Sequence, residues 1–230
     1  MGNSYQTDGA IGSRLNVKIK ICCIESLDEA RLAIDAGADV LGLVGDMPSG
    51  PGVISDQDIK EIASKVSPPV STFTLTSETT AERIKAHIDF TQTTAVQIVS
   101  HIDPHESKKL AEILPNVTRV QVIHVEGESA INLIGVYSDY VDYFLLDSGR
   151  PNADIAELGG TGRTHNWDIS RKFVEMSPVP VFLAGGLNSE NVRDAIQCVN
   201  PYGVDLCSGV RTNGKLDPEK LRLFMKAVRQ

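Results

Sequence analysis

The 230-residue chain has no long hydrophobic run. No apolar segment approaches the roughly 20 residues that a helix needs to span a bilayer, so we expect no membrane partner. Positive charge is also scarce, because 22 Lys and Arg residues stand against 30 Asp and Glu residues, for a formal net charge of −8. This balance disfavours general binding to nucleic acid or to an anionic membrane. It is compatible with a local pocket for a small phosphate.

Cysteine is rare, and its spacing excludes two classes of small domain. Cys22 and Cys23 are adjacent, Cys198 and Cys207 lie far away, and no CxxC pair occurs. The sequence therefore predicts neither a disulfide scaffold nor a zinc site. Reduced thiols are typical of a cytosolic protein, and we expect a cytoplasmic location.

The N-terminal residues 1–16 are polar and rich in Gly and Ser, without the apolar segment of a secretory signal. We interpret them as a flexible arm. Residues 17–230 are long enough for one domain with a substantial core, and we expect them to form a single catalytic domain.

Eight short segments rich in Val, Ile and Leu predict strands that are covered on both faces. They are residues 17–21, 40–44, 70–75, 95–99, 119–124, 143–146, 179–183 and 204–206. Between several of these segments the sequence also predicts where a helix begins. Residues 26–29 and 79–82 read as capping boxes, and Asp217-Pro218 reads as an N-cap followed by proline. The last helix has an apolar stripe of Leu221, Phe224, Met225 and Val228.

Eight strand-then-helix units predict an α/β fold, a single-domain (β/α)8 TIM barrel, because parallel strands need helical crossovers. A doubly wound open sheet is the alternative. It is disfavoured because its Gly-rich turn is missing after the first strand, where residues 22–26 read Cys-Cys-Ile-Glu-Ser. The only long irregular stretch is residues 148–164, and loops of that length are often functional.

Two reactive side chains stand at the ends of predicted strands. Cys22 follows the first strand, and Asp147 follows the sixth. All C-terminal strand ends of a barrel face one mouth, so this thiol and this carboxyl are expected to form an acid–base pair. Lys20 has the same strand parity as Cys22 and can share the interior, where its ammonium would lower the pKa of the thiol. Taken alone, a buried structural cysteine and a capping aspartate would explain both residues.

Two glycine-bearing turns follow the seventh and eighth strands. The first contains Gly185 and Gly186, and the second contains Ser208 and Gly209. Glycine lets backbone N–H groups approach an anion, and barrels often bind phosphate at these two loops. Either turn alone could be only a tight connection. The two together favour phosphate binding.

These features, in order, resemble the phosphoribosylanthranilate isomerase family of tryptophan biosynthesis over nearly the whole chain after the arm. The matching motifs are Lys20-Ile21-Cys22, Ala36-Gly37-Ala38-Asp39, Val96-Gln97, Leu145-Leu146-Asp147-Ser148, Gly159-Gly160-Thr161-Gly162, Trp167-Asp168, Leu183-Ala184-Gly185-Gly186-Leu187-Asn188, Asn191-Val192 and Asp205 with Ser208-Gly209-Val210.

The resemblance implies an intramolecular aldose–ketose isomerase. The reaction is the Amadori rearrangement of N-(5′-phosphoribosyl)anthranilate to 1-(2-carboxyphenylamino)-1-deoxyribulose 5-phosphate. It implies that Cys22 is the general base and Asp147 the general acid, and that neither metal nor cofactor is needed. The expected partner is a small phosphorylated sugar, and the expected state is a monomer or homodimer. The substrate-contact candidates are Lys20, Gln97, His124, Arg150, Gly160, Asp205 and Arg211.

Three positions depart from the family pattern. Cys23 stands where glycine usually follows the catalytic cysteine, and Arg211 stands where Glu is common. The loop at residues 48–55 lacks the arginine that usually reads the anthranilate carboxylate. An arginine fork binds a carboxylate through two hydrogen bonds, so Arg150, Arg163 or Arg211 would have to replace it.

Three other functions stay open at this point. A divergent paralogue would act on another phosphoribosyl-amine, which the missing arginine allows. A cyclase such as indole-glycerol-phosphate synthase would use a lysine and a glutamate. A non-catalytic sensor would bind a sugar phosphate without converting it. Cys22 and Asp147 fit the isomerase better than the cyclase, and the presence of both reactive groups argues against the sensor.

Overall fold

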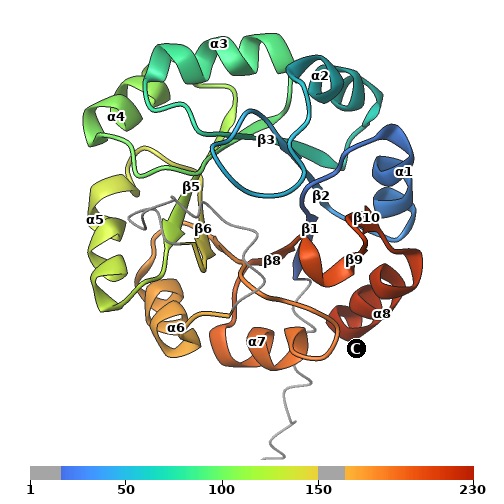
Figure 1. The fold of residues 1–230 in the computed structure, drawn as a ribbon. Coiled ribbons are helices and arrows are strands. Elements are labelled where there is room, and N and C mark those ends of the chain that lie inside the picture. The colour runs from blue at the N-terminus through green and yellow to red at the C-terminus, as the bar shows by residue number, and fades with distance from the viewer. Residues whose placement is uncertain (1–16, 150–163) are drawn as a thin grey trace, which may run out of the picture.

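A computed structural model of the protein describes residues 17–149 and 164–230. Eight parallel strands form a closed barrel in chain order, and β8 pairs with β1. Figure 1 shows the helices as a ring around these strands. The prediction of a (β/α)8 barrel is confirmed, and the open doubly wound sheet is excluded.

The predicted strands agree with the observed ones to within two residues at each end. The barrel strands are β1 (Lys18–Ile21), β2 (Val40–Val44), β3 (Ser71–Thr76), β4 (Ala95–Ile98), β5 (Thr118–His124), β6 (Tyr143–Asp147), β7 (Val181–Leu183) and β8 (Gly203–Leu206). The α-helices are α1 (Leu27–Asp35), α2 (Asp56–Lys65), α3 (Ala81–Thr91), α4 (Pro104–Ile113), α5 (Ile134–Tyr137), α6 (Trp167–Met176), α7 (Val192–Val199) and α8 (Pro218–Arg229).

Alternation along the strands produces two hydrophobic cores. In β2, Val40 and Val44 belong to a cluster inside the barrel, whereas Leu41 and Leu43 belong to the larger cluster that includes the helices. Side chains of successive strand residues point to opposite faces, so each strand contributes to both clusters. Burial of a large aliphatic side chain stabilises the fold by about 1.5–3 kcal/mol. The two cores therefore hold the strand ends rigidly at the mouth.

Two of the three predicted helix starts are confirmed. Ser26 caps α1 by accepting the Glu29 N–H, and Asp217 caps α8 ahead of Pro218. The capping box at residues 79–82 is wrong, because α3 begins after Thr80 and no side chain of its own caps it. Instead Glu106 accepts the Ala81 N–H at 2.6 Å. A carboxylate from the neighbouring helix thus replaces the local cap.

The connection from β8 to α8 contains elements that the sequence did not predict. A short 3-10 helix, η2 (Ser208–Val210), leads into a small hairpin of β9 (Arg211–Thr212) and β10 (Lys215–Leu216). A second 3-10 helix, η1 (Glu128–Leu133), precedes the short α5. Turns of this size carry too little periodicity to be read from sequence.

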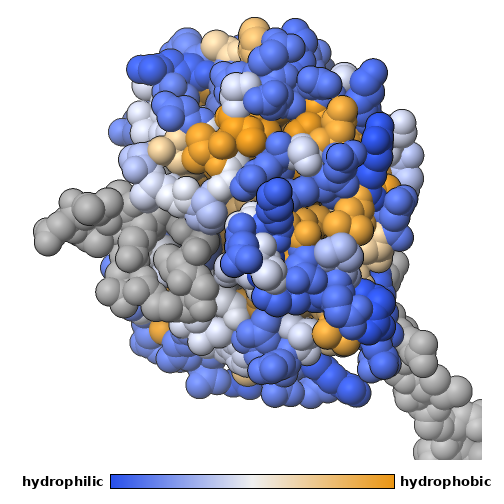
Figure 2. Space-filling model, turned by 45° about the vertical axis from the view of Figure 1, so that its right-hand side comes forward, coloured by the Kyte–Doolittle hydropathy of each residue, from blue (hydrophilic) through white to orange (hydrophobic). Residues whose placement is uncertain are grey.

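The face of the molecule in Figure 2 is mainly hydrophilic, with small apolar patches between polar side chains. No helix in the described ranges is long and apolar enough to cross a membrane.

Candidate active site

A cavity of about 680 Å³, partly open to solvent, lies at the C-terminal mouth of the barrel. In Figure 1 the loop between β2 and α2 crosses over this opening. The cavity is lined by Cys22, Cys23, Val44, Met47, Ser49, Gly50, Pro51, Leu75, Gln97, Val99, Asp147, Ala184, Gly185, Gly186, Leu187, Asp205, Leu206, Cys207 and Ser208.

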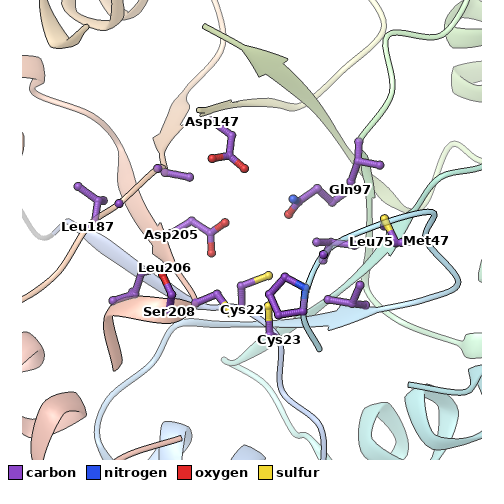
Figure 3. Close-up of a pocket in the computed structure, with 18 of the residues that line it drawn as sticks. Cys22, Cys23, Met47, Leu75, Gln97, Asp147, Leu187, Asp205, Leu206 and Ser208 are labelled. Carbon is purple, nitrogen blue, oxygen red and sulfur yellow. The ribbon is translucent and has the colours of Figure 1, made fainter. Parts of the chain in front are cut away.

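Cys22 and Asp147 line this one cavity, although they are 125 positions apart in sequence (147 − 22). Cys22 follows β1, and Asp147 is the last residue of β6. Figure 3 shows both side chains pointing into the space between them. The expected meeting of thiol and carboxyl at one mouth is thus present in the structure.

Below Cys22 lies a buried ion pair. The Lys20 ammonium is fully buried and donates to Asp205 Oδ1 at 2.9 Å. Gly42 of β2 makes room for it, since a Cβ there would lie 2.9 Å from Lys20 Nζ and 2.8 Å from Cys22 Sγ. Real Cβ atoms do not approach other atoms so closely. The absence of a side chain at Gly42 therefore lets the ammonium and the thiol sit together.

The neighbours of Cys22 favour its thiolate form. The Cys23 thiol, the largest influence, and the Lys20 ammonium lower the pKa of Cys22 below its ordinary value, against the opposing effect of burial. Burial would lower the pKa of Lys20, but Asp205 and Cys22 raise it, so Lys20 stays charged. Because a thiolate is the basic form of cysteine, this surrounding makes Cys22 a stronger candidate for a base than an isolated cysteine.

The surroundings of Asp147 favour its protonated form. Burial, assisted by the nearby charge of Asp205, raises the pKa of Asp147 to about 6, although a hydrogen bond from the Ser148 N–H to Oδ1 at 2.7 Å opposes the shift. Asp147 as a whole is partly exposed and lines the cavity. A carboxyl with a raised pKa can donate a proton near neutral pH.

The two glycine turns meet at the rim of the cavity. Gly185 and Gly186 have φ values of 87° and 62°, which only glycine adopts easily. Gly209 lies against the other turn, because a Cβ there would be 2.1 Å from the Leu187 carbonyl oxygen. Ser208 is exposed and lines the cavity. The two loops thus approach through backbone atoms, which glycine alone permits at this spacing.

The other predicted contacts divide between the cavity and the scaffold. Gln97 and Asp205 line the cavity, and the buried Oε1 of Gln97 has no hydrogen-bond partner among the described residues. His124 is not in the lining, and its buried Nε2 donates to the Val99 carbonyl at 2.8 Å. His124 therefore has a structural bond in place of the expected substrate contact. Arg150 and Gly160 lie outside the described residues, as does Arg163.

Arg211 also lies outside the cavity lining. Its guanidinium binds both oxygens of Glu29, at 3.0 and 2.9 Å, and the carbonyls of Cys23 and Gly214. These bonds tie the hairpin after η2 to the first turn of α1. Arg211 thus has a structural position, and the expectation that it contacts substrate or its carboxylate is corrected.

Sequence reasoning missed Gly42 and the lining residues Met47, Ser49 and Pro51. Gly42 interrupts an otherwise aliphatic strand, and such a glycine often marks a close approach of another group. That signal was available. The loop residues carry no comparable signal, because their place in the lining depends on how the loop folds over the mouth.

The similarity to known proteins extends over most of the chain. The sequence profile described as "N-(5'phosphoribosyl)anthranilate (PRA) isomerase" matches residues 19–227. The N-(5'-phosphoribosyl)anthranilate isomerase 2 of Methanosarcina mazei is 36% identical over 213 residues, covering 91% of this chain and 92% of its own. The chain belongs to the N-(5'-phosphoribosyl)anthranilate isomerase family.

Solved structures of the isomerase family share the fold. The phosphoribosyl anthranilate isomerase of Thermotoga maritima has a TM-score of 0.79 and 29% identity, covering 93% of this chain and 98% of that one. A second isomerase was solved with reduced 1-(o-carboxyphenylamino)-1-deoxyribulose 5-phosphate. It has a TM-score of 0.77 and 28% identity, with 93% and 98% coverage. Both likenesses extend over the whole barrel.

No described residue in the cavity lining is a lysine, arginine or histidine. The loop between β2 and α2 contributes Met47, Ser49, Gly50 and Pro51 to the lining. The described ranges also contain no group of three or more His, Cys, Asp or Glu residues placed to hold a metal.

Proposed function

We propose that this protein is an N-(5'-phosphoribosyl)anthranilate isomerase in which Cys22 is the general base and Asp147 the general acid. The observation that carries this assignment is their joint position on one cavity, with pKa shifts in the directions that the two roles require. Family membership supports the reaction itself.

The first step opens the sugar ring. The Asp147 carboxyl donates its proton to the furanose ring oxygen, and the bond between that oxygen and C1 breaks. The lone pair of the amine nitrogen forms a C=N bond, which gives an iminium ion. Asp147 is left as a carboxylate, stabilised by the hydrogen bond from the Ser148 N–H. General acid catalysis of this kind typically contributes about 10²–10⁴-fold to a rate.

The second step moves the double bond from the C1–N position to the C1–C2 position. The Cys22 thiolate removes the proton from C2, and the C–H electron pair forms a C1=C2 bond while the iminium electrons return to nitrogen. The resulting enolamine tautomerises to the 1-amino-2-ketose. The Lys20 ammonium lies beside the thiolate and favours the charged form of Cys22 before this step.

The phosphate is expected at the two glycine turns. Backbone N–H groups of Gly185, Gly186 and Gly209 and the hydroxyl of Ser208 would bind it, as anions are bound at such turns in other barrels. Gln97 and Asp205 also line the cavity, and they would meet the sugar hydroxyls. The proposed state is a monomer or a homodimer. The proposed location is the cytoplasm.

The test is to mix purified protein with freshly prepared N-(5′-phosphoribosyl)anthranilate and follow the loss of its fluorescence. We expect enzymatic conversion by the wild type and severe loss in C22A and D147A. C198A is the matched control, because Cys198 lies on α7 away from the cavity. Failure of the wild type to convert the substrate, with phosphate ligands still bound, would contradict the proposed substrate.

A further inference from the structure

Three of the four cysteines line the active-site cavity. Cys22 and Cys23 follow β1, and Cys207 follows β8. These two strands are neighbours in the barrel, with Ile21 paired to Leu206, and the Cys22 N–H donates to the Leu206 carbonyl at 2.9 Å. The parallel register therefore carries Cys207 to the same level of the mouth as the two adjacent cysteines. The fourth, Cys198, lies on α7.

The backbone at Cys23 brings two adjacent side chains into one cavity. Consecutive residues of an extended strand point to opposite faces, yet Cys22 and Cys23 both line the pocket. Cys23 has a φ of 62°, in the left-handed region that favours glycine. A non-glycine residue held there is strained, and such strain is concentrated at functional sites. The residue that bears this strain carries a thiol.

Cys23 is the central member of the three thiols. Its side chain lines the same cavity as those of Cys22 and Cys207, and these two neighbours, Cys207 first, raise the pKa of the Cys23 thiol well above its ordinary value. Figure 3 shows Cys22 and Cys23 close together at one edge of the cavity. The loop after β2 encloses Cys23 from outside, because a Cβ at Gly52 would lie 2.4 Å from Cys23 Cβ. The thiols are therefore reached through the substrate cavity and exchange most readily with one another.

We propose that Cys22, Cys23 and Cys207 form a thiol relay in which peroxide oxidises Cys22 and the other two cysteines reduce it again by forming a disulfide between them. The relay is a modification site beyond the isomerase reaction. It protects the thiol that the proposed function assigns as base, but its chemistry does not depend on that reaction.

Each step balances. The Cys22 thiolate attacks one oxygen of hydrogen peroxide, hydroxide leaves, and the sulfur becomes a sulfenic acid. The Cys23 thiol attacks this sulfur, an S–S bond forms, and the hydroxyl leaves as water with the thiol proton. Adjacent cysteines have Cα atoms only about 3.8 Å apart, below the usual range for disulfides, so this bond is strained and reactive. Cys207 then attacks Cys23 and releases Cys22 as a thiol.

The test treats the reduced protein with a small excess of hydrogen peroxide, blocks free thiols by alkylation and maps the tryptic peptides. Residues 21–31 form one peptide with Cys22 and Cys23, and residues 194–211 form another with Cys198 and Cys207. C198S is therefore the background that makes the second peptide unambiguous. We expect a cross-link between Cys23 and Cys207, an alkylated Cys22, and a fall from four to two free thiols in the wild type.

Two variants remove the relay in different ways. C207S removes the last thiol, and C23G removes the central one while accepting the positive φ. In C23G the sulfenic acid lacks its adjacent thiol, and we expect several times more Cys22 sulfinic acid than in the wild type at the same peroxide dose. In C207S we expect the relay to stop at a disulfide between Cys22 and Cys23, whereas C198S matches the wild type. Equal sulfinic acid in wild type and C23G, a C207S protein without the Cys22–Cys23 disulfide, or a final wild-type disulfide that includes Cys22, would overturn the relay. Because the readout is covalent mass, a protein that fails to turn over phosphoribosylanthranilate still tests it.

Discussion

Two lysines of β1 each form an ion pair with an aspartate, one pair at each end of the barrel. Lys18 binds Asp39 at 2.8 Å at the N-terminal end, and Lys20 binds Asp205 at 2.9 Å toward the mouth. The Lys18 side chain is 37% exposed, whereas the Lys20 side chain is 0% exposed. Nearly equal bond lengths therefore belong to very different environments.

The difference separates stability from function. An exposed pair is screened by water and contributes little, with a median of about 0–1 kcal/mol. A buried pair stabilises no better than apolar residues would, but it is costly to break and acts strongly on its neighbours. Lys20 thus sets the charge around Cys22 and Asp147, while Lys18 only joins two strand ends. The proposed chemistry therefore lies at the mouth, and the opposite end is structural.

The largest effect is expected from removing the acid or the base at the mouth. C22A and D147A should each lower kcat by about 10²–10⁴-fold, the usual contribution of a positioned acid or base. The same fluorescence assay should show a normal rate for C198A. A rate within threefold of wild type in C22A or D147A, a margin set at about 0.6 kcal/mol of barrier, would remove that residue from the proposed roles.

The next effect compares the two lysines directly. K20M leaves Asp205 buried without its partner, and breaking such a pair costs about 3–5 kcal/mol of stability. K18M should cost less than about 1 kcal/mol, because both partners reach water. Urea unfolding of both variants measures the contrast. Equal losses of unfolding free energy in K20M and K18M would mean that burial does not distinguish the ion pairs at the two ends of the barrel.

The third effect concerns pH and Asp147. Its pKa is raised in the folded state from 3.8 to about 6, so the folded protein holds this proton more tightly than the unfolded chain. Both states hold the proton below about pH 3. As the pH rises from about 4 to about 6 the unfolded chain ionises before the folded protein does, so the fold loses about 3 kcal/mol at 1.36 kcal/mol per pKa unit.

D147N removes this ionisation while keeping an oxygen for the Ser148 N–H. Its stability relative to wild type should therefore rise by up to about 3 kcal/mol between pH 4 and pH 7.5. Thermal unfolding across that range, with wild type measured in the same buffers, provides the curve. A difference that stays constant with pH would mean that Asp147 has an ordinary pKa.

The smallest effect is expected at two glycines that lie against other groups so closely that a side chain would not fit. At Gly209 an added Cβ would meet the Leu187 backbone at the mouth, and at Gly203 it would lie 2.4 Å from the Phe182 ring at the opposite end. G209A and G203A should each lose about 1–3 kcal/mol of stability through overpacking. Only G209A should also raise KM, because it displaces a proposed phosphate loop. A raised KM in G203A would contradict this separation.

Local signals were enough to predict the barrel. Runs of Val, Ile and Leu marked the strands because both of their faces are buried, and the caps at Ser26 and Asp217 act within their own helices. The capping box at residues 79–82 failed because Glu106, from the neighbouring helix, takes the Ala81 N–H. A local sequence motif does not reveal that a side chain from another helix will bind the same backbone N–H group.

The site was predictable only where it follows from topology. Cys22 and Asp147 could be placed at one mouth because every barrel strand ends there. The bond between Lys20 and Asp205 joins residues 185 positions apart, and that between Arg211 and Glu29 joins residues 182 apart. Such pairings depend on the packing of complete side chains. For this reason Arg211 was expected at the substrate and is found in the scaffold.

The most direct test of the central claim is a crystal structure of this protein with reduced 1-(o-carboxyphenylamino)-1-deoxyribulose 5-phosphate, the ligand carried by a related isomerase. We expect the sugar chain between Cys22 Sγ and the Asp147 carboxyl, with the phosphate on the turns of Gly185 and Ser208. A ligand bound with its phosphate elsewhere, or with only one of the two groups against the sugar, would contradict it.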